Sequence, residues 1–297
     1  MAHAGSQKST IVRPSQRLLR TAFRTLEHTA PALGARWADR WWFALPTAPI
    51  GDLPPSGTPF EVQSQGRTIR GHRWGAGPVV YLVHGWGGNE TQLAKLVAPL
   101  VGAGFTVVTH DAPSHGTSDP GAVAGQSHAV EMGHALDAVA AVHGPAHAVV
   151  AHSMGGLATG LTLRYGWLGT DRLALVAPMV RIADHLPTLE AGLGFGPRTR
   201  ERLKRRAYDR VGLAVEEVDF VRLAGEIDRP ELLVIHDRGD RLAKYASAVQ
   251  LVDSWEGARL TTTEGLGHQR ILADDAVVRQ VVAFVIAGQL DELEKSA

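Results

Sequence analysis

Short apolar segments alternate with longer, helix-like segments through most of the chain, and this alternation restricts the fold more than any other feature. The first such segment, residues 79–83, is apolar or aromatic at every position, as in a strand that is buried on both faces. Strands that alternate with helices predict right-handed crossovers and a mostly parallel, doubly wound α/β sheet with helices on both faces. Ligands bind such sheets at the carboxyl ends of the strands.

The same patterns predict the other elements. Two alternating segments separated by Gly66 are typical of a hairpin that precedes the parallel strands. The expected strands are residues 58–65, 67–75, 79–83, 105–111, 146–153, 172–178, 231–237 and 258–264. The expected helices are residues 90–103, 127–143, 154–166, 244–255 and 273–287. We therefore expect an α/β domain over residues 58–290 and a C-terminal tail over 291–297.

One long segment, residues 181–228, interrupts the alternation and predicts a helical cap inserted over the carboxyl edge of the sheet. From Arg198 to Arg210 it holds seven basic and two acidic residues. Four of these share one face of the predicted helix: Arg198, Arg202, Arg205 and Arg206. This face is either a solvated surface or a rim that attracts an acidic substrate or an anionic membrane.

Residues 1–57 are expected to form a disordered tail (1–13), an amphipathic helix and a Pro-rich connector. Pro14 and Ser15 predict the start of the helix, which runs to about Thr29. Its apolar face holds Leu18, Leu19, Ala22, Phe23 and Leu26, and its basic face holds Arg13, Arg17, Arg20 and Arg24. Such a helix either docks on its own domain or makes a peripheral contact with an anionic membrane.

Composition excludes several classes of function. The formal net charge is zero, which gives no general case for a nucleic-acid partner. Because cysteine is absent, disulfides, a thiolate nucleophile and Cys-ligated zinc are impossible, and a cytoplasmic location is expected. The N-terminal residues have no apolar region of the kind found in a signal peptide, and no apolar run in the chain is long enough for a membrane span. Neither a metal nor a cofactor is expected, since HExxH does not occur and His110, Asp111 and His115 lack a metal-binding arrangement. The oligomeric state does not follow from the sequence.

A serine marks the middle of the chain. In the stretch AHSMGG, Ser153 lies between an apolar strand and a helix-like segment, followed by Gly155 and Gly156. A strand-to-helix turn of this kind lifts the hydroxyl above the sheet, beside the N-terminal N–H groups of the helix. The usual pattern is G-x-S-x-G, and Ala151 stands at its first position. A serine that merely caps the helix is the alternative interpretation of this motif alone.

Three further motifs follow predicted strands. HGWGG (84–88) ends the strand 79–83, IHDRGD (235–240) ends the strand 231–237, and GLGH (265–268) follows the strand 258–264. A reactive serine needs a base, an acid that orients the base, and N–H donors for the oxyanion. The order of Ser153, an acid at 237 or 240, and His268 matches one known arrangement of such a triad.

Together with DAPSHGTSD (111–119), these motifs resemble the α/β-hydrolase superfamily over residues 58–290. The resemblance implies that Ser153 is the nucleophile, His268 the general base and acid, and Asp240 the orienting acid, with Asp237 as the rival. It also implies an oxyanion hole formed by the backbone N–H groups of Trp86 and Met154. We expect three residues to line the substrate pocket: His84, Gly85 and His152. Another set, His128, His134 and Asp137, is expected to form a solvated face.

These features predict a serine hydrolase that cleaves a carboxylic ester through an acyl-enzyme, with a small-molecule ester as substrate. The same triad serves thioesters, amides and C–C bonds, because the fold does not fix the substrate. A non-catalytic binding protein that kept the fold is the alternative from a different class.

Overall fold

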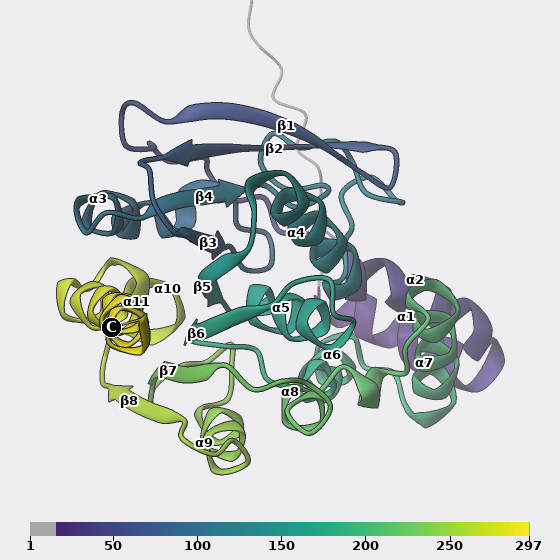
Figure 1. The fold of residues 1–297 in the computed structure, drawn as a ribbon. Coiled ribbons are helices and arrows are strands. Elements are labelled where there is room, and N and C mark those ends of the chain that lie inside the picture. The colour runs from purple at the N-terminus through teal and green to yellow at the C-terminus, as the bar shows by residue number, and fades with distance from the viewer. Residues whose placement is uncertain (1–15, 297) are drawn as a thin grey trace, which may run out of the picture.

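The structure, a computed structural model, describes residues 16–296. Its centre is a sheet in the order β1-β2-β4-β3-β5-β6-β7-β8, seen nearly edge-on in Figure 1. The strands are β1 (Thr58–Ser64), β2 (Arg67–Trp74), β3 (Val79–Val83), β4 (Thr106–His110), β5 (Ala146–His152), β6 (Thr170–Val176), β7 (Glu231–Asp237) and β8 (Arg259–Thr263). The pairs β1–β2 and β2–β4 are antiparallel and all others are parallel. The predicted α/β fold is confirmed.

Helices cover both faces of the sheet because its strands alternate apolar side chains to either side. Tyr81 and Val83 belong to the core under α4 (Ala129–His143) and α5 (Met154–Arg164). Val80 and Leu82 belong to the core under α3 (Ala94–Gly102) and α11 (Asp275–Ser296). The short α8 (Phe220–Leu223) and α9 (Tyr245–Asp253) complete the first layer. Since α11 runs to Ser296, residues 291–296 continue a helix and are not the expected tail.

A separate helical layer lies beside α5, at the right of Figure 1. It consists of α1 (Gln16–Thr29), α2 (Pro31–Phe43), α6 (Leu186–Leu193) and α7 (Pro197–Val211), which we call the cap. The cap helices share their own apolar core: Phe23, Ala35, Ala38, Leu186, Leu193, Phe195 and Leu203. The N-terminal helix therefore docks on the inserted segment, and the cap is built from two distant parts of the sequence.

Helix α2 corrects the expected connector, which begins only after Phe43. Pro31 occupies the first turn of α2, where its missing N–H costs nothing. Gly34 lets α2 approach α7 closely, because a Cβ at this position would lie 3.1 Å from Thr199 Oγ1. The sequence pattern did not reveal α2, because three tryptophans and two arginines obscure its buried face of small residues.

Glu27 joins α1 to the start of α7. Its buried carboxylate accepts hydrogen bonds from the backbone N–H groups of Gly196 (3.1 Å), Arg198 (2.8 Å) and Thr199 (3.0 Å). Burial alone would raise the pKa of Glu27, but these hydrogen bonds lower it below its usual value. A glutamate from one segment thus caps a helix of the other, where the helix dipole favours negative charge.

Among residues 16–296, no helix has both the length and the apolar character that a membrane span requires. The predicted disordered residues 1–13, together with Arg13, Pro14 and Ser15, lie outside the described part of the chain.

Candidate active site

Ser153 occupies the sharp turn between β5 and α5. Its backbone has φ 51° and ψ −120°, a conformation that costs energy for a residue with a side chain. The turn depends on Gly155, since a Cβ there would lie 2.5 Å from the His84 carbonyl oxygen. Gly156 is less constrained, because its Cβ would lie 3.3 Å from the Leu175 side chain.

The structure brings Ser153, His268 and Asp240 together at the carboxyl edge of the sheet. His268 Nε2 lies 3.0 Å from Ser153 Oγ, and His268 Nδ1 lies 2.7 Å from Asp240 Oδ2. Asp240 follows β7, and His268 lies in α10 (Gly267–Arg270) after β8. The Asp240 side chain is fully buried and that of His268 nearly so. This continuous chain of hydrogen bonds is the arrangement that activates a serine.

Asp240 and Asp237 have different partners. Burial opposes ionisation of Asp240, but hydrogen bonds from His236, His268 and the Ala243 N–H outweigh it and hold the pKa well below its usual value. Asp237 accepts hydrogen bonds from Thr263 Oγ1 and from the backbone N–H groups of Leu266 and Gly239, each at 2.9 Å. Asp237 therefore fixes the loop that carries His268, whereas Asp240 contacts the imidazole.

Sequence analysis missed the role of His236. This histidine is completely buried, and its Nε2 lies 3.3 Å from Asp240 Oδ2, the same oxygen that contacts His268. Its position within the IHDRGD motif, four residues before Asp240, was the available signal. A second polar group at the carboxylate restricts the rotation of Asp240 and so helps to orient His268.

Two neutral histidines anchor the 84–88 loop that carries Trp86. His84 Nε2 accepts the Ala112 N–H at 3.0 Å, and His115 Nε2 accepts the Gly87 N–H at 3.2 Å. Each ring uses its Nδ1 for a carbonyl oxygen, which fixes the tautomer. Burial lowers the pKa of His84 to about 4 and that of His115 to about 3. Both rings thus remain acceptors for the loop at neutral pH.

Gln92 links this loop to the segment that carries His268. Its Oε1 accepts the Gly85 N–H at 2.7 Å, and its Nε2 donates to Gln269 Oε1 at 3.2 Å, one residue after His268. His152 lies beside the same group and contacts the His268 carbonyl oxygen through Nε2 at 3.1 Å. Burial lowers the pKa of His152 to about 3. Gln92 was not singled out in the sequence, because nothing in its neighbourhood distinguishes it.

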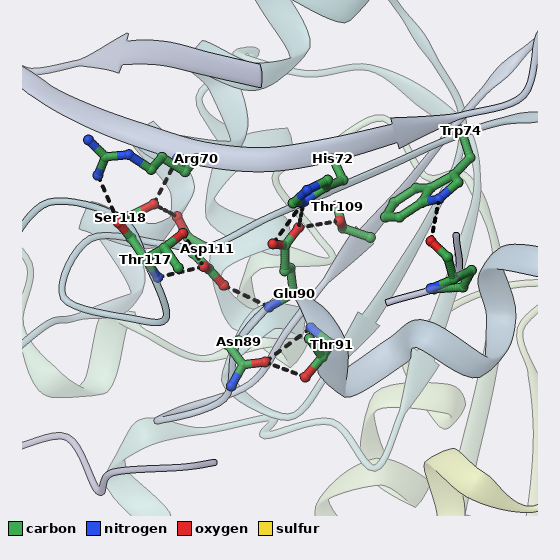
Figure 2. Close-up of polar contacts among 11 residues, drawn as sticks. Arg70, His72, Trp74, Asn89, Glu90, Thr91, Thr109, Asp111, Thr117 and Ser118 are labelled. Carbon is green, nitrogen blue, oxygen red and sulfur yellow. Dashed lines mark hydrogen bonds and ion pairs between the residues drawn. The ribbon is translucent and has the colours of Figure 1, made fainter. Parts of the chain in front are cut away.

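A second polar network holds the helical turn after the loop, η1 (Glu90–Leu93), as Figure 2 shows. Asp111 Oδ1 accepts a hydrogen bond from the Glu90 N–H at 2.7 Å, and Glu90 Oε2 accepts one from the Thr109 hydroxyl at 2.9 Å. His72 Nδ1 lies 2.9 Å from the same carboxylate, whose pKa burial raises above its usual value. Asp111 of the DAPSHGTSD stretch therefore helps to hold the η1 turn, which follows the 84–88 loop.

An apolar cavity of about 960 Å³ separates the cap from the sheet edge. Trp86 and Met154 contribute to its wall, so both residues of the predicted oxyanion hole border it. Met154 is the first residue of α5, and its N–H has no acceptor within its own helix. The cap contributes mainly apolar side chains, including Leu19, Trp41, Trp42, Phe43, Leu189, Leu193 and Val211.

Several predicted residues lie elsewhere than expected. His84, Gly85 and His152 are not among the residues that line this cavity, and neither are Ser153 and His268. Gly85 instead lies against His152 and Ser153, since a Cβ on Gly85 would be 2.8 Å from His152 Nδ1 and 3.0 Å from Ser153 Cβ. His128 is no solvated residue, because it accepts the Glu131 N–H at the start of α4 and lines the cavity, and burial lowers its pKa to about 4. His134 stacks on Trp167 at 4.1 Å. Asp137 is half-buried, so these three do not form a solvated face.

The histidines around Asp111 form no metal site. Within residues 16–296, no cluster of three or more His, Asp or Glu side chains is arranged to hold a metal ion. His115 instead contacts the 84–88 loop, and His110 is buried with its pKa lowered to about 4.

Comparisons with known proteins agree with this fold. A family model described as the alpha/beta hydrolase family matches residues 80–284, whereas no curated protein matches the chain. Among solved structures, Est1E from Butyrivibrio proteoclasticus, with ferulic acid bound, is similar at 16% identity and a TM-score of 0.60, over 79% of this chain and 99% of that chain.

A meta-cleavage product hydrolase from Pseudomonas fluorescens IP01 is similar at 16% identity and a TM-score of 0.58, over 76% of this chain and 96% of that one. A monoacylglycerol lipase from Paleococcus ferrophilus is similar at 20% identity and a TM-score of 0.57, over 74% of this chain and 99% of that chain. At these identities the structures share the fold, and the family match covers most of the chain. The chain therefore belongs to the α/β-hydrolase family.

Proposed function

We propose that this protein is a serine hydrolase that cleaves carboxylic esters through an acyl-enzyme. The observation that carries the proposal is the hydrogen-bonded chain from Ser153 Oγ through the His268 ring to the Asp240 carboxylate. His268 takes the hydroxyl proton while Ser153 attacks the ester carbonyl. The backbone N–H groups of Trp86 and Met154 then stabilise the oxyanion, and each contributes about a hundredfold or more to the rate.

The second half of the cycle repeats the first with water. The tetrahedral intermediate collapses and the C–O bond of the ester breaks, with His268 returning its proton to the leaving alcohol. Water then gives a proton to His268 and attacks the acyl carbonyl. When this second tetrahedral intermediate collapses, the bond between the acyl carbon and Ser153 Oγ breaks, His268 returns its proton to Oγ, and the carboxylic acid is released. Asp240 stabilises the imidazolium in both steps and holds the ring in the required tautomer.

The cavity favours an ester with a large apolar acyl group. Its wall is mostly aliphatic and aromatic, and its volume of about 960 Å³ lies at the upper end of the usual range for ligand sites. Trp86 and Met154 border it, so an acyl chain in the cavity would bring its carbonyl toward their N–H groups. Thioesters of the same acids fit equally well, and the triad also serves amides and C–C bonds.

Covalent labelling with a fluorophosphonate tests the proposal. We expect one adduct on Ser153 by intact mass and peptide mapping, and none in Ser153→Ala that retains the wild-type melting temperature. A matched series of p-nitrophenyl esters and acyl thioesters of increasing chain length then assigns the substrate class. If the folded wild-type protein forms no adduct, the chain is a binding protein on a hydrolase fold and the proposal fails.

A further inference from the structure

The cap carries a concentrated positive charge. Helices α1, α2 and α7 contain twelve arginines and lysines but four acidic residues, whereas the whole chain contains 30 of each. Two of those four acids, Glu27 and Asp39, are buried inside the cap. The outer surface of these helices is therefore strongly basic, although the net charge of the chain is zero.

Apolar side chains lie within this basic surface. Leu33, Trp37 and Trp41 recur every four residues along α2, and their exposed fractions are 42%, 41% and 56%. Residues at this spacing form one stripe along a helix. Trp37 contacts Phe23 of α1 edge-on, with 6.3 Å between the ring centroids, so the middle of the stripe lies beside α1.

Arginines border the stripe. Arg36 and Arg40 are exposed on α2 itself, next to Trp37 and Trp41 in the sequence. From α7, Arg202, Arg205 and Arg206 share a shallow hollow with Ala32 and Ala35 of α2, which places them alongside this helix. The same hollow contains the acidic Glu201 and Asp209, so basic residues outnumber acidic ones there by three to two. We call the exposed surface of α2 and α7 the docking face, defined by Leu33, Arg36, Trp37, Arg40, Trp41, Arg202 and Arg205.

The stripe ends at the active-site cavity. Trp41 is more than half exposed and is also part of the cavity wall, together with Gln16 and Leu19 at the start of α1. The cavity thus reaches the surface next to the last tryptophan of the stripe. A molecule that covered the docking face would have its apolar groups beside an apolar cavity that is bordered by Met154, the residue after Ser153.

We propose that the docking face binds an anionic lipid bilayer and that the cavity draws its acyl substrate from that layer. Tryptophans and leucine flanked by arginines are the composition of helices that lie in a membrane interface. The N-terminal residues 1–15 do not complement this surface, since they contain Lys8 and Arg13 and no acidic residue. The second half of the proposal rests on the proposed esterase activity, whereas the binding itself does not.

Vesicle flotation of the full-length Ser153→Ala protein tests the binding without hydrolysis. The probes are phosphatidylcholine vesicles with and without phosphatidylglycerol, at low and at high salt. We expect binding only to the anionic vesicles and only at low salt, because salt screens the attraction. Each arginine near an anionic surface strengthens binding roughly fivefold, so Leu33→Ser/Arg202→Glu/Arg205→Glu should bind at least about 25-fold more weakly.

The matched control is Val142→Ser/Arg73→Glu/Arg279→Glu, which changes three exposed residues outside the cap and should bind like the wild type. In the active enzyme, both triple variants should hydrolyse a soluble short-chain ester at the wild-type rate, since none of the changed residues lines the cavity. Only the docking-face variant should lose hydrolysis of a long-chain ester presented in anionic vesicles.

Three results overturn the proposal: no flotation with anionic vesicles, equal binding to neutral ones, or equal binding of the docking-face variant. Binding of the wild type to an acidic protein or to a second copy of itself, but not to vesicles, also overturns it. If the vesicles bind but no ester or thioester is hydrolysed, the proposed function fails and the docking face stands. If soluble esters are hydrolysed but the protein does not bind vesicles, the proposed function stands and the docking face fails.

Discussion

The carboxyl edge of the sheet and the cap meet at the same cavity but are stabilised in opposite ways. At the sheet edge, short loops are fixed by hydrogen bonds between buried polar groups, such as His84 with the Ala112 N–H and Asp237 with the Leu266 N–H. In the cap, helices from two parts of the chain share an apolar core with few buried charges. Polar contacts fix atoms precisely, whereas apolar packing tolerates change. Under the proposed function, the edge would therefore carry out the chemistry and the cap would select the substrate.

The largest effect is expected at the triad. Asp240→Asn should lower kcat by about 10⁴-fold, because the amide no longer stabilises the imidazolium or the correct tautomer of His268. Asp237→Asn is the matched control, and it should lower the melting temperature while largely keeping kcat, since Asp237 contacts the loop and not the ring. Ester kinetics and thermal unfolding of both variants check this. Should Asp237→Asn be the inactive variant, the assignment of the acid is wrong.

The two glycines after the serine test how precisely the edge is built. Gly155→Ala places a Cβ 2.5 Å from the His84 carbonyl oxygen and 2.7 Å from that of Val83, both backbone atoms that cannot move aside. We expect kcat to fall by about a hundredfold or more, because the neighbouring Met154 N–H is displaced. The free energy of unfolding should fall by about 1–3 kcal/mol.

Gly156→Ala is the matched control for this pair. Its Cβ would meet only the end of the Leu175 side chain at 3.3 Å, which can shift by a few tenths of an ångström. Kinetics and urea unfolding should therefore remain near wild type. If both variants lose activity and stability equally, the whole turn is constrained, and not only the close contact between Gly155 and the His84 carbonyl oxygen.

In the cap, filling the cavity should change selection and not chemistry. Leu189 lies in α6 and lines the cavity, so Leu189→Trp shortens the space for an acyl chain. We expect kcat/KM for long-chain esters to fall by about 10–200-fold, the range for a few methylene groups, while acetyl esters are unaffected. The p-nitrophenyl ester series measures both. Uniform loss across the series would show that the cap also positions the triad.

The smallest effect on activity is expected for Glu27, which links the two parts of the cap. Glu27→Ala removes the acceptor of three N–H groups at the start of α7 and should destabilise the cap by about 1–3 kcal/mol. Hydrogen exchange should increase in α7 but not in β5, and short-ester activity should persist. Glu201→Ala, an exposed acid on α7, is the control. Faster exchange throughout the protein would mean that cap and sheet unfold as one unit.

Membrane binding could also be tested by deleting residues 1–45, but this deletion would disturb the active-site loop and the cap as well. The chain that follows α2 lies over the 84–88 loop, where Trp86 Nε1 donates to the Ala44 carbonyl oxygen at 3.2 Å. Deletion would also expose the cap core at Phe23 and remove a wall of the cavity. Substitutions on the outer surface separate docking from folding, whereas truncation does not.

The sequence by itself determined the order of strands and helices, the turn at Ser153, and the residues that meet there. Each of these depends on a local signal: apolar runs for strands such as 79–83, glycines beside the serine, and an acid or histidine just after a strand. The topology of a parallel sheet then brings the carboxyl ends together, so residues far apart in sequence meet without further information.

Only the tertiary structure decided the rest. The resemblance favours Asp240 over Asp237 as the acid, but only the direction of each side chain shows that Asp240 contacts the His268 ring and Asp237 the loop before it. Gln92 and His236 matter through contacts that no local pattern encodes. Helix α2 hides its buried face of small residues among tryptophans, and the cap joins residues 16–43 to 186–211 by apolar packing. Such packing is non-directional, so composition permits it in many arrangements and only the folded chain selects one.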